Sequence, residues 1–315
     1  MSKLLAVFGA TGNQGSSVVK FVLNDPSLSK QYRIRAITRD VPSPKSQALP
    51  SSVEVVAADT SDPKSLVSAL QNVHIVCLMS TPAFGPNALE GEFQTIKTTV
   101  DIAVAQGVDY IIFSTLPSVA EISKGKYTRV TPFDAKAKAE GYIRLLSPKV
   151  SSAFYCPGSF MENFLHPAAA GIRRLGGDAE EKWVMERHVS GNTRLPLIAA
   201  VEDTGKFVGA ILADPGKLKG KTLRAMERWY SLEEIVAKLS KITGKKVEYK
   251  QVELKEKVEE MGFWEGLFAE YFEYLEEFGY FGLGQDEELE WSQSMAWGKL
   301  VEFEEWLERN EIVLS

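Results

Sequence analysis

The sequence predicts an α/β protein, with a Rossmann-type doubly wound parallel sheet followed by a smaller, mainly helical C-terminal α/β domain. Over the first 160 residues, short apolar runs alternate with longer stretches of helical periodicity, and a glycine-rich turn follows the first run. Strands that alternate with helices imply right-handed crossovers and a sheet covered on both faces. We expect a first domain at residues 1–157 and a smaller domain at 158–315, with some chain crossing back to the first sheet.

The predicted strands are short runs rich in Val, Ile, Leu, Phe or Ala: Lys3–Phe8, Arg33–Thr38, Val53–Ala57, His74–Met79, Tyr110–Phe113 and Ser152–Cys156. The predicted helices between them are Gly15–Leu23, Asp62–Leu70, Leu89–Ala105 and Phe133–Leu146. Asp62 followed by Pro63 is typical of a helix start, and the pairs Ser159/Glu162 and Ser231/Glu234 have the spacing of a capping box.

After residue 160 the predicted strands and helices no longer alternate regularly. We expect strands at Trp183–Val189, Leu195–Ala199 and Leu223–Met226, and a helix capped by Asp203 that runs to Leu212. His166 is expected to end a short helix that contains Pro157–Asn163. From Ser231 onward the pattern is mainly helical.

The composition is that of an ordinary globular protein, with 44% hydrophobic and 25% charged residues among 315. No apolar run approaches the roughly 18 residues needed to cross a bilayer, and no secretory signal is recognisable. Cys77 and Cys156 lack the spacing of a disulfide or metal framework, so we expect no metal site and a cytoplasmic location. A nuclear location stays open if the protein is a regulator.

Charge is distributed unevenly along the chain. Residues 251–315 carry 18 acidic and 4 basic side chains, whereas residues 1–250 carry 24 acidic and 32 basic ones. The acidic segment is either a solvated surface or a region kept away from an anionic ligand that the basic part binds. Direct nucleic-acid binding is not expected, because the chain has no basic run with interleaved aromatic residues.

A glycine-rich loop joins the first predicted strand to the first helix, with Gly9, Gly12 and Gly15 at intervals of three residues. The first glycine permits the tight turn, the second lets the backbone approach a pyrophosphate, and the third lets the helix pack close to the sheet. Main-chain N–H groups around Thr11, Asn13 and Gln14 then face the phosphates. The sequence therefore predicts a dinucleotide site.

The end of the second strand decides between NADP(H) and NAD. An arginine here holds a 2′-phosphate through charge-assisted bonds, whereas an acidic residue binds both ribose hydroxyls. Arg39 follows the strand directly and Thr38 adds a hydroxyl, so we favour NADP(H). Asp40 keeps NAD as the alternative.

Polar residues at other strand ends should complete the site, because ligands lie outside the carboxyl edge of a parallel sheet. Asp59 and Thr60 are candidates for the adenine end. The stretch Ser80-Thr81-Pro82 should run beneath the cofactor, and Ser114 should lie close to the nicotinamide.

Four motifs together resemble the NmrA-like family, atypical members of the short-chain dehydrogenase/reductase superfamily with a Rossmann fold. They are Gly9-Ala10-Thr11-Gly12-Asn13-Gln14-Gly15, the strand end Thr38-Arg39, Phe133-Asp134-Ala135-Lys136 and Pro157-Gly158-Ser159-Phe160-Met161-Glu162-Asn163. The likeness continues into Phe278–Gly282 and Phe303–Trp306, so it covers nearly the whole chain.

The resemblance implies that the glycine loop and Arg39 bind NADP(H) and that Lys136 reaches the nicotinamide ribose. It also implies that Pro157, Phe160 and Asn163 lie in a turn that closes over the nicotinamide, and that Lys97 approaches the cofactor. Members of the family include redox-sensing regulators that contact a transcription factor, and reductases, some of them in natural-product pathways.

Catalysis, if present, should depend on Lys136. The superfamily places its tyrosine acid four residues before the lysine, and that position is Pro132 here. In isoflavone-reductase-like relatives a similarly placed lysine serves as acid and base. A partly desolvated lysine near a nicotinamide charge has a lowered pKa and can exchange protons near neutrality. Lys136 either does this or only bonds the ribose, and Tyr127 and Ser114 are further hydroxyls that could reach a substrate.

Three functions stay open at this stage. The first is an NADPH-dependent reductase of a bulky organic substrate with a C=O, C=N or activated C=C bond, such as a natural-product tailoring enzyme. The second is a non-catalytic NADP(H) or NAD sensor that acts through a protein partner. The third is a nucleotide-bound enzyme that catalyses condensation or cyclisation.

Apolar, mainly aromatic residues form a stripe at helical spacing: Trp264, Phe268, Tyr271, Phe272, Leu275 and Phe278. We expect most of them in the core of the smaller domain, and the placement of the others distinguishes the first two functions. If these rings line a closed cavity against Lys136, a small-molecule substrate is favoured. If they form an exposed patch, a protein partner is favoured.

Overall fold

The computed structural model describes residues 2–166, 170–175, 182–254 and 261–314. Its main sheet has seven strands in the order β11-β6-β5-β4-β1-β2-β3, and all neighbouring strands are parallel. The strands are β1 (Lys3–Phe8), β2 (Tyr32–Thr38), β3 (Glu54–Ala57), β4 (Ile75–Leu78), β5 (Tyr110–Ser114), β6 (Ser151–Pro157) and β11 (Thr222–Ala225). The strand order reverses between β1 and β4, which is where Rossmann-type sheets bind ligands. The predicted fold class is confirmed.

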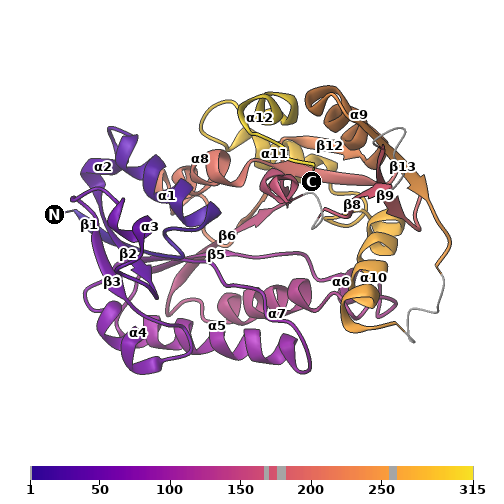
Figure 1. Ribbon diagram of the computed structural model, residues 1–315. Coiled ribbons are helices and arrows are strands. Elements are labelled where there is room, and N and C mark those ends of the chain that lie inside the picture. Colours follow the sequence, from indigo (N-terminus) through magenta and orange to yellow (C-terminus); the bar gives the residue numbers. More distant parts are fainter. Residues whose placement is uncertain (1, 167–169, 176–181, 255–260, 315) are drawn as a thin grey trace.

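Helices cover both faces of this sheet (Figure 1). One face carries α1 (Asn13–Asn24), α2 (Leu28–Gln31) and α8 (Ala200–Ala213), and the other carries α4 (Pro63–Ala69), α5 (Ala88–Ala105) and α7 (Thr131–Leu145). Because successive strand residues point to opposite faces, Leu5 and Val7 pack under α1 and α8 whereas Leu4 and Ala6 pack under the other layer. Two short helices, α3 (Pro44–Gln47) and α6 (Val119–Ile122), lie in the loops.

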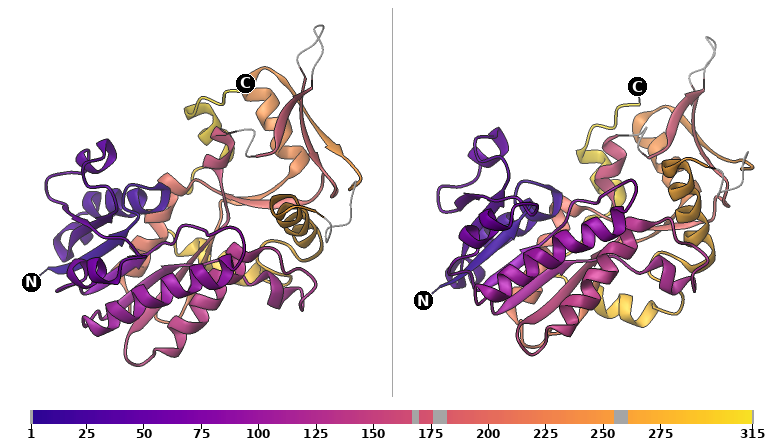
Figure 2. Two further views of the ribbon diagram at one scale, coloured as in Figure 1. Left: turned by 60° about the horizontal axis from the view of Figure 1, so that its bottom comes forward. Right: turned by 90° about the horizontal axis from the view of Figure 1, so that it is seen from below.

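The second part of the molecule lies at the end opposite the N-terminus (Figure 2). It contains two three-stranded sheets, ordered β12-β10-β7 and β13-β9-β8. Their strands are β7 (Ser159–Phe160), β8 (Ile172–Leu175), β9 (Lys182–Arg187), β10 (Arg194–Ile198), β12 (Arg228–Ser231) and β13 (Lys246–Gln251). The helices are η1, a 3-10 helix (Met161–Leu165), α9 (Leu232–Thr243), α10 (Phe263–Phe278), α11 (Asp286–Ser294) and α12 (Phe303–Arg309).

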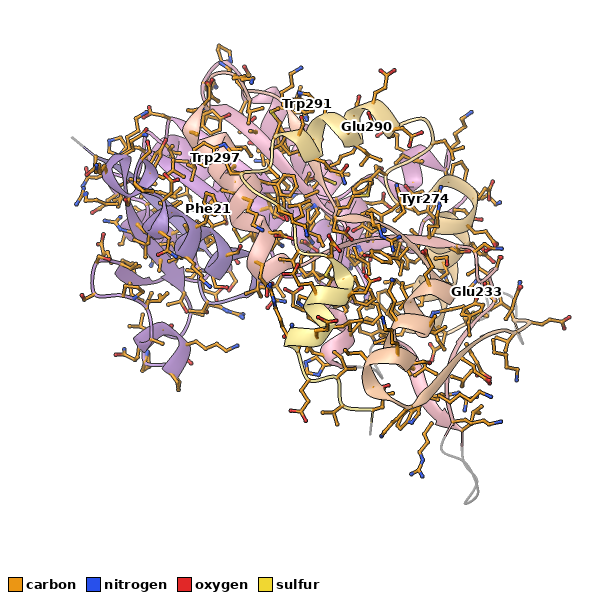
Figure 3. All side chains as sticks on the ribbon, turned by 90° about the horizontal axis from the view of Figure 1, so that it is seen from above. Phe21, Glu233, Tyr274, Glu290, Trp291 and Trp297 are labelled. Atoms are coloured by element: carbon orange, nitrogen blue, oxygen red, sulfur yellow. The ribbon has the colours of Figure 1, made fainter. Side chains whose placement is uncertain are left out.

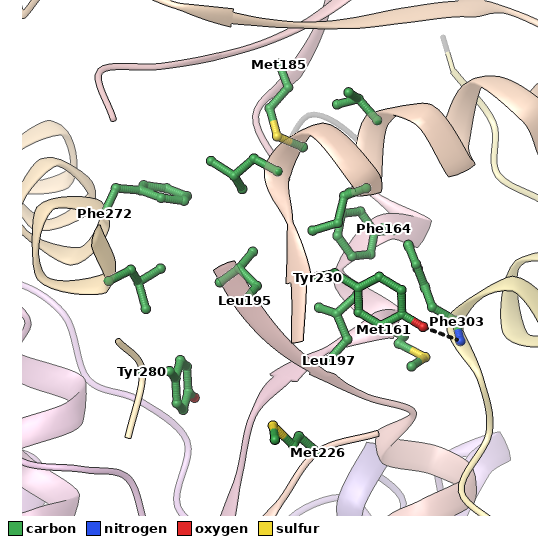
Figure 4. Packing of buried hydrophobic residues seen from close by; sticks show 14 of the residues in the cluster. Met161, Phe164, Met185, Leu195, Leu197, Met226, Tyr230, Phe272, Tyr280 and Phe303 are labelled. Carbon is green, nitrogen blue, oxygen red and sulfur yellow. Dashed lines mark hydrogen bonds between the residues drawn. The ribbon is translucent and has the colours of Figure 1, made fainter. Parts of the chain in front are cut away.

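A single apolar core joins the two small sheets to these helices. Figure 4 shows Phe272 of α10 pointing toward Met185 of β9 and Leu195 of β10, and the Tyr230 hydroxyl accepting a hydrogen bond from the Phe303 N–H. The sequence predicted strands close to β9, β10 and β11, but it did not predict β13, which follows helix α9.

Two predicted helix starts were wrong. Ser159 and Glu162 do not form a capping box, because η1 begins at Met161 without a side-chain cap. The Glu162 carboxylate instead accepts hydrogen bonds from the N–H groups of Ala200 and Val201, at 3.1 and 2.7 Å, and so caps helix α8 from outside. The capping box at Ser231 and Glu234 is confirmed.

Asp203 does not cap α8 either, since that helix already begins at Ala200. Its carboxylate is fully buried, accepts hydrogen bonds from Lys206 Nζ and the Val301 N–H, and so ties α8 to the segment before α12. Desolvation raises the pKa of this carboxyl group. His166 ends η1, as the sequence predicted, but the predicted helix over Pro157–Asn163 began too early, because Pro157 ends β6 and Ser159–Phe160 form β7.

Neither cysteine is arranged for chemistry. Cys77 and Cys156 are buried and free, and burial raises the pKa of the Cys77 thiol to about 12. Among the described residues there is no group of three side chains able to hold a metal ion. No helix in the same part of the chain has the length and apolarity needed to span a membrane.

Helices α1 and α8 cross at two glycines of α8. A Cβ atom added at Gly205 would lie 2.5 Å from Phe21 Cβ and 2.6 Å from the Ser17 carbonyl oxygen. At Gly209 it would lie 2.3 Å from Phe21 Cε1. On its other side the Phe21 ring contacts Trp297, with ring centroids 6.2 Å apart (Figure 3). The position of α1 therefore depends on the absence of side chains at these two sites.

We expect Gly205→Ala to lower the free energy of unfolding by about 1–2 kcal/mol, because overpacking against backbone outweighs the roughly 1 kcal/mol that alanine gains in a helix. Gly141→Ala in α7 is the matched control, since nothing lies within 4 Å of an added Cβ there, and it should be neutral or stabilising. Urea denaturation measures both. Equal stability of the two variants would contradict the packing argument.

Candidate functional site

The glycine loop forms a compact turn at the carboxyl end of β1. Gly9 adopts a left-handed φ of +60°, and the Gly12 N–H donates to the Gly9 carbonyl oxygen at 2.8 Å. A Cβ at Gly15 would lie 2.2 Å from that same oxygen, and one at Gly12 would lie 3.3 Å from it. Only glycine fits at position 15, as the motif predicted, because the helix begins in contact with the turn.

The start of α1 is open to a ligand. Its N-cap residue is Gly12, no side chain caps it, and its first turn carries no acidic residue. The N–H groups of the first turn therefore have no hydrogen-bond acceptor from a capping side chain. An anion is the group that such a helix start accommodates best. The loop thus fits the pyrophosphate of the expected dinucleotide.

On one side of the loop lies a cavity of about 490 Å³, which we call the Arg39 cavity. At the adenosine end its polar lining comes from the ends of β2 and β3, the loop before α3 and α3 itself: Thr38, Arg39, Asp40, Ser43, Lys45 and Thr60. Four of these residues were expected from the sequence, and the structure adds Ser43 and Lys45. Two cationic side chains and two carboxylates, Asp40 and Glu92, line the cavity. Because Glu92 is paired with Lys136, the remaining charges favour an anionic group.

On the other side lies a cavity of about 580 Å³, the Lys136 cavity. It shares Gly9, Gly12, Ser80 and Thr81 with the Arg39 cavity, so the two form one cleft along the carboxyl edge of the sheet. The predicted residues that line it are Asn13, Gln14, Gly15, Pro82, Ser114, Lys136, Pro157, Phe160 and Asn163. Tyr271 and Tyr280 close it from the C-terminal part.

Lys136 forms a buried ion pair that the sequence did not predict. Its Nζ donates to Glu92 Oε1 at 2.5 Å, and both side chains are less than a tenth exposed. Glu92 comes from α5 and Lys136 from α7, which pack side by side. The same carboxylate accepts hydrogen bonds from the Ser80 hydroxyl and the Ala83 N–H. Glu92 therefore links the Lys136 side chain to the loop after β4.

Burial lowers the pKa of Lys136, and the attraction of Glu92 opposes this shift without cancelling it. The direction agrees with the expectation from the sequence, although the structure attributes it to desolvation alone. At the end of β5 the Ser114 hydroxyl donates to Gln14 Oε1 at 2.7 Å, which links this strand to the start of α1. The Thr115 hydroxyl contacts the Lys136 carbonyl oxygen.

Three predicted site residues do not line either cavity. Lys97 pairs with Asp101 at 2.6 Å and lies over the Tyr142 ring. The Asp59 carboxylate accepts two hydrogen bonds from Ser61, which lower its pKa.

Tyr127 is buried at the far side of α10, where its hydroxyl donates to Glu277 at 2.9 Å. Burial raises the pKa of Tyr127. Each of the three has a carboxylate or hydroxyl partner of its own outside the cleft.

The aromatic stripe is divided between interior, cavity and surface. Phe272 and Leu275 are buried, Phe268 and Tyr271 line a cavity described below, and Trp264 is about half exposed. Trp264 also belongs to an exposed aromatic cluster that we define as Phe84, Phe263, Trp264 and Phe268. Phe84 reaches it from the loop after β4, at 4.5 Å between ring centroids.

A model of the NmrA-like family matches residues 1–307. The chain belongs to the NmrA-like family. Among curated relatives, the NmrA-like family domain-containing oxidoreductase FrzB of Cladobotryum sp is 32% identical over 265 residues, which are 80% of this chain and 77% of that protein. The resemblance inferred from the sequence motifs is confirmed.

Solved structures agree on the fold. NmrA, a negative transcriptional regulator in complex with NADP, has a TM-score of 0.74 at 21% identity. The alignment covers 98% of this chain and 94% of the NmrA chain. The Citrobacter sp. triphenylmethane reductase complexed with NADP(H) has a TM-score of 0.72 at 19% identity and covers 97% of this chain and 99% of its own. NmrA has also been solved in complex with NAD. Regulators and reductases thus share this NmrA-like architecture.

We expect Glu92→Gln to lower the pKa of Lys136 further, because the lost carboxylate is what raises that pKa against desolvation. Since the folded pKa lies below the ordinary lysine value of 10.5, the buried ammonium costs stability at neutral pH and less as the pH rises toward 10.5. The variant should therefore lose more stability at pH 7 than at pH 10.

Carbon-13 NMR titration of labelled lysine side chains measures this pKa directly. Glu90→Gln is the matched control, because Glu90 lies in the same helix as Glu92 and pairs with the exposed Lys138 of α7. An unchanged Lys136 titration in Glu92→Gln would show that the two groups are not coupled.

Proposed function

We propose that this NmrA-like protein is an NADPH-dependent reductase of a bulky organic substrate with a C=O, C=N or activated C=C bond. The observation that carries the proposal is the position of Lys136. This buried lysine with a lowered pKa lines the cavity that joins the glycine loop to the aromatic side chains of α10. A proton donor therefore lies between a cofactor site and an apolar substrate site.

The lining of the Arg39 cavity supports NADP(H) as the cofactor. Arg39 and Lys45 offer two cations, and Ser43 and Thr38 offer hydroxyls, at the place where an adenosine ribose with a 2′-phosphate would lie. NADP is present in the NmrA and triphenylmethane reductase complexes, and NADPH in that of the Escherichia coli quinone oxidoreductase QOR2. Asp40 lines the same cavity, and NAD is the weaker candidate.

When bound, the reduced nicotinamide supplies a hydride to the electrophilic carbon of the substrate. Lys136 donates a proton to the atom that takes up the electron pair of the broken π bond. Its lowered pKa makes the ammonium group a better acid near neutral pH. Glu92 holds Nζ in place and keeps it charged despite burial, while the apolar walls formed by Phe133, Tyr271 and Tyr280 limit the access of water.

The exposed aromatic cluster favours a second candidate, a sensor that acts through a protein partner. Phe84, Trp264 and Phe268 are each about half exposed, which is uncommon for contiguous rings on a monomer. This role would leave Lys136 as a cofactor-binding residue without turnover. Steady consumption of NADPH with a small-molecule acceptor excludes it.

We expect Arg39→Ala to lower the affinity for NADPH by about 10- to 100-fold, the worth of a charge-assisted contact to the 2′-phosphate, and to leave the affinity for NADH nearly unchanged. Isothermal titration calorimetry with both nucleotides measures this. Arg33→Ala is the control, because Arg33 lies on β2, the strand that Arg39 follows, and its exposed side chain is outside the cavity. Parallel losses for NADPH and NADH would contradict a role in phosphate selection.

We expect Lys136→Met to lower kcat by about 10²- to 10⁴-fold while the affinity for NADPH stays within about tenfold, because proton donation is lost and the glycine loop is retained. The acceptors are a quinone (menadione), a cyclic imine (2-phenyl-1-pyrroline) and an enone (trans-chalcone), with NADPH oxidation followed at 340 nm. Lys138→Met, two residues further along α7 and exposed, is the control. Wild-type turnover in Lys136→Met would overturn the proton role.

A further inference from the structure

A third cavity, of about 320 Å³, lies beyond the Lys136 cavity, and we call it the Arg187 cavity. The two share Phe133, Ser159, Asn163 and Tyr271, so a ligand can extend from one into the other. Most of its other lining is apolar and comes from β9, β10 and α10, including Met185, Leu195 and Phe272, which are labelled in Figure 4.

Arg187 is the one charged residue among the described residues that line this cavity. Its Nη1 and Nη2 donate to the carbonyl oxygens of Glu186 and Ala170, at 2.7 and 2.6 Å. Its guanidinium lies over the Phe272 ring at 4.5 Å. Its Nε is buried and has no hydrogen-bond acceptor in the part of the chain that the structure describes.

The charge of Arg187 has no counter-ion within the described residues. The carboxylate of the neighbouring residue Glu186 forms ion pairs with Arg173 and Lys250 on the opposite face of β9. Desolvation therefore lowers the pKa of Arg187, although an arginine stays charged at neutral pH. Burying a guanidinium without an anion is unfavourable, and an anionic ligand would compensate for it.

The backbone is shaped around this guanidinium. Gly171, with φ of +73°, precedes β8, and a Cβ there would lie 2.1 Å from Nη2 and 2.2 Å from Nη1 of Arg187. The side chain thus occupies the space that any other residue at position 171 would fill. Two carbonyl oxygens and one aromatic face hold the guanidinium at the wall of an otherwise apolar cavity.

We infer that the substrate is an organic carboxylate with an apolar body, and that Arg187 binds its carboxylate. This inference rests on the proposed function, because it places the substrate in the cavity next to Lys136. A planar guanidinium matches a carboxylate geometrically, and the apolar walls select a hydrophobic body. Arg187 is thus a specificity-determining residue, and its charge orients the reducible bond toward the Lys136 cavity.

The test compares two probes of the same size and apolar body, the anionic 4-phenylbutyrate and the neutral 4-phenylbutanamide. Calorimetry is performed with the full-length protein saturated with NADP⁺ and again without nucleotide. We expect the acid to bind wild type at least about tenfold more tightly than the amide, as a charge-assisted contact predicts. We expect Arg187→Met to abolish this preference by weakening the acid alone.

Arg173→Met is the matched control, since Arg173 lies on the neighbouring strand and pairs with Glu186, and it should change neither affinity. Equal binding of acid and amide to wild type, no binding of either, or an unchanged preference in Arg187→Met would overturn the inference. The wild-type comparison keeps the test valid if a variant does not fold. Because the measurement needs no turnover, a failure of hydride transfer would refute the proposed function while leaving the carboxylate site intact.

Discussion

The contact between Gly15 and the Gly9 carbonyl oxygen fixes where helix α1 begins, and the remaining geometry of the cleft follows from it. On its outer side α1 is held against α8 by the absence of a side chain at Gly205. The N–H groups of its first turn are therefore placed by backbone contacts rather than by flexible side chains. The ends of β4 and β5 then meet this fixed helix start, and Ser114 bonds Gln14 across the junction.

Most of the fold could be predicted from local sequence patterns. Apolar runs and glycine spacing predicted all seven strands of the main sheet and the turn at Gly9, because these features are encoded within a few neighbouring residues. Lys136 was found from a motif and from the family resemblance. Glu92 could not be found in this way, since nothing in its own helix distinguishes it from Glu90, and only the packing of α5 on α7 brings it to Lys136.

Contacts distant in the sequence also explain where the structure differs from local patterns. Glu162 has the spacing of a local cap, but buried N–H groups of α8 offer its carboxylate a better-satisfied position. Tyr127 and Lys97 are suitable in type, but each is bound by a carboxylate from another turn or helix. The acidic surplus of the last 65 residues likewise has internal partners, because Glu270 accepts from the N–H groups of Thr128 and Arg129 and Glu277 pairs with Lys126. These contacts anchor α10, and with it the aromatic wall of the cleft.

The loop after β4 connects the interior of the cleft to the molecular surface. Its Ser80 hydroxyl and Ala83 N–H are held by the buried Glu92, and the next residue, Phe84, places its ring against Trp264 of α10. A half-exposed indole is thus in contact with a loop that lines both halves of the cleft. One of the six tryptophans of the chain, Trp264, thereby places an intrinsic fluorophore against this loop.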